Sequence, residues 1–228
     1  MRACCPAPAR RRSREAGPAP MSVTPLSFDQ VPEIVETFSD AFHDYPVMRY
    51  VLGDAPPYEA RLRRLVELFV SGRAWRREPM LGVRDAEGAL AAAATMTLPE
   101  PRDPPAAFLA LRESIWAELG ADARARYDAF VSATQASAIA APHHHLNMIG
   151  VRRARQGRGL ARVLLEAVHD LAGRDGRSTG VSLTTELPAN VTLYGRFGYE
   201  VRGRARVAET LETWTLFRGA LAAGAGTA

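Results

Sequence analysis

Lysine is absent from this chain, and cysteine is confined to its first five residues. All 29 basic residues are arginines. A Walker-type phosphate loop needs a lysine after its last glycine, so that class of nucleotide site is excluded. Beyond Cys4 and Cys5 the chain has no thiol. This excludes a disulfide framework and a cysteine nucleophile in the body, and it favours a reducing, cytoplasmic environment.

Long apolar runs and an unbalanced body charge are also missing. No stretch approaches the ~20 apolar residues of a membrane-spanning helix. Five arginines and one glutamate in the first twenty residues account for the whole net charge of +4. The remainder has 24 arginines and 24 acidic residues. The basic charge therefore indicates neither a nucleic-acid partner nor a membrane partner.

Composition divides the chain into three parts. Residues 1–20, rich in arginine and proline, are interpreted as a disordered leader or as an upstream extension before a natural start at Met21. Arg10 to Arg14 resembles the opening of a signal peptide, but the apolar segment of about 7–15 residues does not follow. Residues 21–219 have the size of one domain with a sizeable core. Residues 220–228 are interpreted as a flexible tail.

Hydrophobic periodicity predicts a mixed α/β sheet of about seven strands flanked by helices. The alanine run at 89–94 would favour a helix by propensity, but Gly88 before it and Thr95 to Thr97 after it favour a strand. A helical insertion, broken at Gly120, separates the third strand from the fourth. The strands are predicted at 23–26, 80–84, 89–98, 142–151, 181–187, 200–207 and 211–217, and the helices at 31–42, from Pro56 onward, at 108–139 in two pieces, at 159–173 and from Asn190 to Gly198.

The segment 146–165 has the features of an anion site. An apolar strand ends near Val151, an arginine-rich turn carries Gly157 and Gly159, and an amphipathic helix begins at once. The first N–H groups of a helix lack partners and favour an anion such as phosphate. The two glycines leave those amides accessible and tolerate positive φ angles.

Two familiar sites that this region could suggest do not fit. A dinucleotide fingerprint needs a third glycine where the chain has Arg162, and it starts directly at the strand end. The segment 176–180 matches the Gly-x-Ser-x-Gly elbow of serine hydrolases. That elbow must follow a strand and open a helix, whereas this one follows a helix and opens a strand.

Gln156-x-x-Gly159-x-Ala161, preceded by Ile149-Gly150-Val151, resembles the acyl-CoA loop of the GNAT superfamily of N-acetyltransferases. Further on, Leu193-Tyr194 with Phe197-Gly198-Tyr199 resembles the aromatic signature of the same superfamily. Together with His143-x-x-Leu146 and Thr185-Glu186-x-x-x-Asn190, the pattern is similar to the branch that contains puromycin N-acetyltransferase. The detailed match begins at His143. Arg153 departs from it, since relatives often have proline there.

The resemblance implies the GNAT fold, acetyl-CoA as cosubstrate and a set of site residues. The strand end Met148, Ile149, Gly150 and Val151 would splay from its neighbour and pair with the pantetheine arm. Asn190 would contact the same arm, and Tyr194 would be the general acid that protonates the departing sulfur. The backbone amides that would take the pyrophosphate are those of Gln156, Gly157, Arg158, Gly159, Leu160 and Ala161.

Other side chains remain open between a functional and a structural role. Glu186 is a candidate base or an anchor for the acceptor amine, or else an exposed carboxylate at a strand end. His143 and His145 share a strand face by period two, and histidine suits deprotonation of an ammonium group. No cysteine or nearby acid completes a metal site around them, and a structural or pocket-lining role is favoured. Asp44 would hold an ammonium group or simply close a turn.

The leading hypothesis is an acetyl-CoA-dependent N-acetyltransferase that acetylates the primary amine of a small molecule by direct attack in a ternary complex. The alternative is a non-catalytic acyl-CoA-binding module that acts as a sensor or scaffold. Protein acetylation is disfavoured if the insertion at 99–141 narrows the acceptor groove. We expect no metal, no nucleic acid and no membrane partner, and a monomer or homodimer. The identity of the amine lies beyond the sequence.

Overall fold

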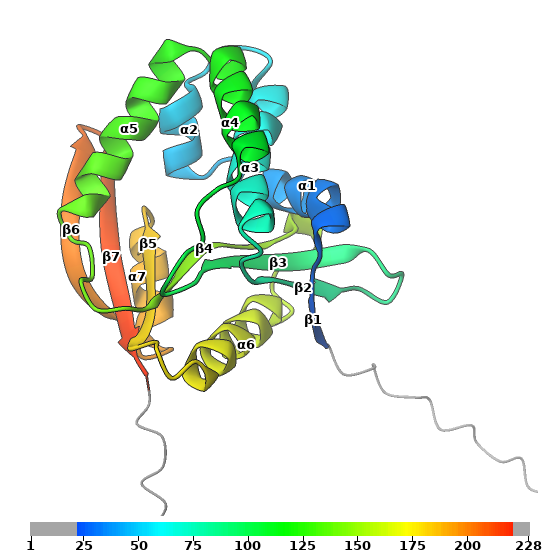
Figure 1. Ribbon diagram of the computed structural model, residues 1–228, viewed down its shortest axis with the longest axis vertical. Coiled ribbons are helices and arrows are strands. Elements are labelled where there is room, and N and C mark those ends of the chain that lie inside the picture. The colour runs from blue at the N-terminus through cyan, green and yellow to red at the C-terminus, as the bar shows by residue number, and fades with distance from the viewer. Residues whose placement is uncertain (1–21, 221–228) are drawn as a thin grey trace, which may run out of the picture.

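The computed structural model describes residues 22–220, and the predictions for residues 1–20 and 221–228 lie outside this range. Figure 1 labels its elements. The strands are β1 (Val23–Pro25), β2 (Met80–Arg84), β3 (Leu90–Thr97), β4 (His144–Val151), β5 (Gly180–Thr185), β6 (Glu200–Ala208) and β7 (Leu211–Gly219). The α-helices are α1 (Val31–Ala41), α2 (Pro46–Leu52), α3 (Tyr58–Trp75), α4 (Ala106–Leu119), α5 (Ala121–Gln135), α6 (Leu160–Arg174) and α7 (Pro188–Gly195).

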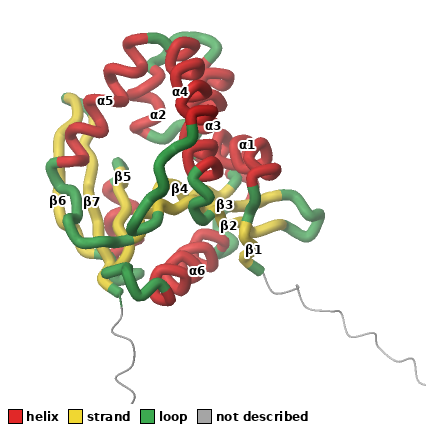
Figure 2. The backbone as a smooth tube through the Cα atoms, in the orientation of Figure 1, coloured by secondary structure: helices red, strands yellow, loops and turns green. Residues whose placement is uncertain are grey.

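The seven strands form one sheet in the order β1-β2-β3-β4-β5-β7-β6. Every neighbouring pair is antiparallel except β4 and β5, which run parallel. The predicted mixed, mostly antiparallel sheet is therefore confirmed, and the alanine run is strand β3. Helices α1 to α5 gather on one side of the sheet and α6 covers the other (Figures 1 and 2).

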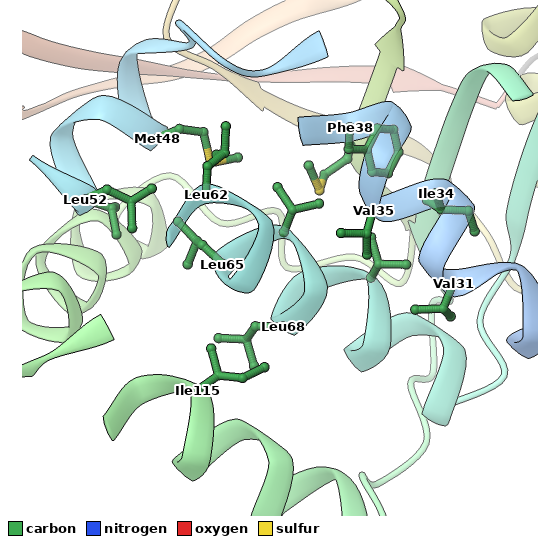
Figure 3. Close-up of a cluster of buried hydrophobic side chains, with 14 of the residues drawn as sticks. Val31, Ile34, Val35, Phe38, Met48, Leu52, Leu62, Leu65, Leu68 and Ile115 are labelled. Carbon is green, nitrogen blue, oxygen red and sulfur yellow. The ribbon is translucent and has the colours of Figure 1, made fainter. Parts of the chain in front are cut away.

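Each face of the sheet has its own apolar core. On the side of α1 to α4, Phe38, Leu62, Leu65 and Ile115 are almost fully buried and converge from three helices (Figure 3). On the other side, the inward face of α6 packs on β3, β4 and β5. The predicted amphipathic spacing of α6 matches this packing. Because α6 packs on these strands, its first residues lie next to the end of β4.

One helix was not predicted. The first two predicted helices lie at 31–42 and from Pro56 onward, whereas the structure has a further helix, α2, that begins at Pro46. Proline suits the first turn of a helix because the N–H group that it lacks would have no partner there. Three α-helices, rather than two, therefore lie between β1 and β2. The break before α2 places Tyr45 at the helix start, over the centre of the sheet.

The helical insertion follows the prediction. Helices α4 and α5 are separated at Gly120, whose φ angle of +90° few other residues adopt. Trp116 and Tyr127 bring the two helices together, with ring centroids 5.2 Å apart. Helix α5 also contacts α2, β6 and β7. The insertion thus covers the sheet at β6 and β7, the two strands that follow β5 in the sheet order. No helix within residues 22–220 is long and apolar enough to cross a bilayer.

Replacing Gly150 by alanine is expected to destabilise the fold. A Cβ atom there would lie 2.9 Å from the Cβ of Ala41 and 3.0 Å from a ring carbon of Phe38. Overpacking of this kind costs about 1–3 kcal/mol of unfolding free energy. Urea denaturation measures the loss. Gly173→Ala is the control, because its Cβ would meet nothing within 4 Å. Equal stability of the two variants would contradict the close approach of α1 to β4.

Candidate active site

Two adjoining cavities meet at the centre of the sheet. One, called here the loop cavity, has a volume of about 480 Å³ and runs beside the turn before α6. The other, called the sheet cavity, has a volume of about 250 Å³ and lies between the sheet and the helices above it. The residues that line both are Phe42, Tyr45, Ile149, Asn190 and Tyr194. Ligands in the two cavities would therefore share one wall.

The cavities open where β4 and β5 part. Their pairing runs from His144 opposite Val181 to Leu146 opposite Leu183. Beyond that point β4 continues to Val151 along β3, and within residues 22–220 no strand pairs with its other edge. A register shift against β3, at Asn147, bends β4 near the parting. The exposed edge offers backbone N–H and C=O groups to an extended ligand.

The turn between β4 and α6 is held by ion pairs. Both Gly157 and Gly159 have positive φ angles, +76° and +79°, and α6 begins directly after them. The side chain of Arg153 lies 3.1 Å from Asp40, and that of Arg155 lies 2.8 Å from Asp85. These arginines thus anchor the turn to neighbouring acids. Arg158 is exposed. The amides at the start of α6 remain the feature best suited to an anion.

A network of hydrogen bonds joins the start of α2 to the end of β5. The hydroxyl groups of Tyr45 and Thr185 lie 2.9 Å apart. Asn190 donates through its side-chain nitrogen to the Thr185 hydroxyl at 3.1 Å. The backbone N–H of Glu186 donates to the Tyr45 hydroxyl at 3.3 Å. Residues distant in the sequence are therefore fixed together where the two cavities meet.

Glu186 is buried, so the alternative of an exposed strand-end carboxylate is wrong. Its residue is 8 % exposed, and it accepts a hydrogen bond of 2.8 Å from the Thr213 hydroxyl. Burial raises the pKa of Glu186 to about 7, because water no longer stabilises its charged form. The carboxyl group can therefore take up or release a proton near neutral pH.

Tyr194 is also buried, 8 % exposed, and its ring packs on Tyr199 with centroids 5.6 Å apart. Burial, and next the charge of Glu186, raise the pKa of Tyr194 to about 12. The phenol therefore keeps its proton at neutral pH. A buried, protonated phenol on the shared wall is placed to donate a proton to a ligand in either cavity.

The structure brings together most of the predicted site residues. Met148 and Glu186 line the sheet cavity, while Asn190 and Tyr194 line both. Arg158 lines neither cavity. The predicted residues that line the loop cavity are Ile149, Gly150, Val151, Gln156, Gly157, Gly159, Leu160, Ala161, Asn190 and Tyr194.

The structure places His143 outside the candidate site. It precedes β4 and lines neither cavity; its ring packs on Phe217, with centroids 5.9 Å apart, and it bonds the carbonyl of Ala141. His145, two residues further, does line the sheet cavity, and burial lowers its pKa to about 4. Asp44 is paired with Arg49 at 2.5 Å and lies outside both cavities.

Sequence reasoning missed the residues that α1, α2 and α3 contribute to the site. Phe42 and Tyr45 come from the end of α1 and the start of α2, Arg73 comes from α3, and Tyr127 and Phe130 come from the insertion. In the turn Asp44-Tyr45-Pro46 the sequence indicates the carboxylate of Asp44 as a candidate, whereas it is the phenol of Tyr45 that lines both cavities. Tyr127 and Phe130 belong to an aromatic cluster that the sequence leaves open between packing over the sheet edge, which it favours, and a lid or a wall of the acceptor pocket; both residues line the sheet cavity.

Comparison with known proteins gives this geometry a family context. Residues 112–201 match the family model described as an acetyltransferase (GNAT) domain. The match runs from α4 to the start of β6 and includes the parted strands, the glycine turn and Tyr194. The predicted GNAT fold is confirmed by solved structures that cover most of the chain.

Three of those structures illustrate the similarity. A histone acetyltransferase HPA2 and related acetyltransferase from Corynebacterium glutamicum is 21 % identical, with a TM-score of 0.65 over 90 % of this chain and 99 % of its own. A phosphinothricin acetyltransferase from Sinorhizobium meliloti, solved with acetyl-CoA, is 15 % identical, with a TM-score of 0.52 over 91 % and 92 %. A mosquito arylalkylamine N-acetyltransferase like 5b is 13 % identical, with a TM-score of 0.55 over 87 % and 99 %.

Proposed function

We propose that this chain, which has the GNAT fold and matches the GNAT acetyltransferase domain over residues 112–201, transfers an acetyl group from acetyl-CoA to the primary amine of a small molecule. The observation that carries the proposal is the shared wall of the two cavities. The buried phenol of Tyr194 lies on that wall, and the buried carboxyl group of Glu186 lines the sheet cavity on one side of it.

The loop cavity fits the donor. The amides around Gly157 and Gly159 would bind the pyrophosphate, since within residues 22–220 no atom beyond the chain neighbours lies within 4 Å of a Cβ built at either glycine and the start of α6 favours an anion. The free edge of β4 beyond Leu146 would pair with the amide groups of the pantetheine arm. The complex of the phosphinothricin acetyltransferase with acetyl-CoA supports this choice of donor.

The two buried groups divide the proton transfers. Acetyl-CoA supplies a thioester whose carbonyl carbon the amine nitrogen attacks, forming the C–N bond as the C–S bond breaks. Glu186 accepts the proton that the nitrogen loses, directly or through water. Tyr194 gives its proton to the leaving sulfur. The products are an amide and a free thiol, with Glu186 protonated and Tyr194 ionised. Return of a proton from Glu186 to Tyr194 through solvent restores both side chains, so that one proton has passed from nitrogen to sulfur overall.

The insertion favours a small acceptor over a protein. Tyr127 and Phe130 from α5 line the sheet cavity, opposite the strands. A cavity of about 250 Å³ roofed by side chains suits a compact amine better than an extended peptide. The resemblance of the segment from His143 onward to the puromycin N-acetyltransferase branch also favours a small molecule.

Thiol release from acetyl-CoA in the presence of a panel of primary amines tests the proposal. Amine-dependent release, with the acetylated amine identified by mass spectrometry, is the expected result. Binding of acetyl-CoA without transfer to any amine would instead favour a non-catalytic acyl-CoA module. No binding of acetyl-CoA at all would remove both readings.

Replacing Gly159 by alanine is expected to weaken acetyl-CoA binding about tenfold. The residue has a φ angle of +79°, which costs a residue with a Cβ atom about 1–2 kcal/mol. The turn would shift and misdirect the amides before α6. Calorimetry measures the change in Kd. Gly173→Ala, near the other end of α6, serves as control, and equal affinities for the two variants would count against an anion site at this turn.

A further inference from the structure

The sheet cavity has a charged group at each end. Arg73 lies at one end, where its Nη1 atom bonds the Thr97 hydroxyl, and Thr97 is paired with His145. His145 is opposite Ser182 in the parallel register of β4 and β5. Glu186 lies four residues beyond Ser182 along the same chain direction. At about 3.3 Å per residue, the two ends are about 13 Å apart along the strands.

Arg73 is held in place by its contacts with Glu78. Its Nη1 atom lies 3.1 Å from Oε2 of Glu78, whose side chain is 0 % exposed. The contact has ion-pair distance without hydrogen-bond geometry, since both carboxylate oxygens of Glu78 lack a hydrogen-bond partner among the described residues. Backbone bonding of Glu78 to the carbonyl of Arg73, 3.0 Å, holds the two residues together. The guanidinium group is thus positioned rather than free to swing into solvent.

The guanidinium group also has donors to spare. Within residues 22–220, the one hydrogen bond that its side chain makes uses Nη1. A guanidinium group carries five N–H donors in a planar fork, which matches a carboxylate. Burial raises the pKa of Glu78, which disfavours the proton-free, fully charged state of that carboxyl group. The N–H donors of Arg73 that Thr97 does not use are available to a ligand in the cavity.

The wall between the two charged ends is largely apolar. Phe69 and Tyr127 face each other with ring centroids 5.5 Å apart. His145 adds no positive charge at neutral pH, since burial lowers its pKa to about 4. Other apolar residues that line the sheet cavity are Val47, Met48, Phe130, Leu146 and Leu183.

From this polarity we infer that the acceptor carries a carboxylate as well as its amine, joined by an apolar or aromatic spacer, and that Arg73 binds the carboxylate. The inference rests on the proposed function, which places the reacting amine beside Glu186 and Tyr194. A ligand of opposite polarity then has its amine at the carboxyl end of the cavity and its carboxylate at the guanidinium end. Arg73 is accordingly a residue that determines specificity, not a catalytic residue.

Matched acceptors test the inference. The panel pairs 4-(aminomethyl)benzoate with 4-(aminomethyl)benzamide, and linear ω-amino carboxylates of increasing length with the corresponding alkylamines. The wild-type protein is expected to prefer the carboxylates by about tenfold or more in kcat/KM. Arg73→Met should remove that preference, mainly by raising KM for the carboxylates, while kcat/KM for the neutral amines changes less than about threefold. Arg73→Lys should restore part of it.

Several results would overturn the inference. One is a wild-type protein with equal kcat/KM for carboxylate and neutral acceptors. Another is an Arg73→Met variant in which kcat/KM falls by the same factor for both acceptor classes. The Kd for acetyl-CoA should stay unchanged in the variant, because Arg73 does not line the loop cavity. If the variant does not fold, an inhibition assay on the wild-type protein takes its place. We then expect 4-methylbenzoate to inhibit and 4-methylbenzamide not to inhibit, and equal inhibition by the two compounds would count against the inference.

Failure of the proposed function has a different signature. Acetyl-CoA would then yield no acetylated amine of either class. In that event, calorimetry with 4-(aminomethyl)benzoate decides the matter: binding that Arg73→Met abolishes would sustain the carboxylate subsite without catalysis. Absence of binding to the wild-type protein would overturn the subsite as well.

Discussion

The Tyr194→Phe variant is expected to lose about 100-fold or more in kcat, while its KM for acetyl-CoA stays near that of the wild-type protein. The substitution removes the proposed proton donor and keeps the ring that packs on Tyr199 at 5.6 Å. A positioned general acid contributes about 10²- to 10⁴-fold to a rate. Steady-state kinetics with a responsive amine, varying each substrate in turn, measures both parameters.

Tyr199→Phe is the matched control. Tyr199 is also buried and packs on Tyr194, but its hydroxyl bonds Nε2 of His169 at 3.0 Å and the residue lines neither cavity. Its kcat should remain within about threefold of the wild-type value, since no proton passes through it. A Tyr194→Phe variant as active as Tyr199→Phe would remove Tyr194 from the chemistry and leave it a packing residue.

The Glu186→Gln variant is expected to lose about 100-fold in kcat and to lose one limb of the pH profile. Burial raises the pKa of Glu186 to about 7, so the base is in its ionised form only as the pH rises through that value. The wild-type rate should therefore climb around pH 7. The same acceptor is used for both proteins, so that titration of the amine affects both profiles alike. An identical limb in the variant would assign the titration to another group.

Stability provides an independent check on the same carboxyl group. Its pKa is raised from 4.5 in the unfolded chain to about 7 in the folded protein. Below pH 4.5 both states are protonated, and the folded state has its full relative stability. Between pH 4.5 and 7 the unfolded chain ionises first, so wild-type stability falls by about 3 kcal/mol. Glu186→Gln lacks this fall, and melting temperatures across that range would reveal it.

Local patterns were sufficient for the sheet and for the turn before α6. The alternation in β5, the 3.6-residue period of α6 and the two glycines at 157 and 159 depend on neighbours in the sequence. The same holds for the break between α4 and α5 at Gly120. These features were predicted because each one restricts the type of residue at its own position: a buried strand or helix face needs apolar residues, and a positive φ angle favours glycine.

The residues that α2 and α3 contribute to the sheet cavity could not be predicted from local sequence patterns. Tyr45 reaches Thr185 across 140 positions of the chain, and Arg73 reaches the cavity from a helix whose periodicity marks only its buried face. His143 was grouped with His145 by period two, but β4 begins between them, at His144, and the period does not extend beyond the strand. Contacts made by tertiary packing leave no local signal.

The insertion supplies part of the acceptor wall while the loop cavity is built by other elements. Tyr127 and Phe130 belong to α5, whereas the glycine turn, the free edge of β4 and α7 lie outside the insertion. Under the proposed function, the insertion shapes part of the acceptor wall, while Arg73 of α3 and the elements of the loop cavity lie outside it. Exchanging the helical hairpin, as evolution or protein engineering can do, is then expected to alter which amines are admitted and to leave the chemistry of the thioester unchanged.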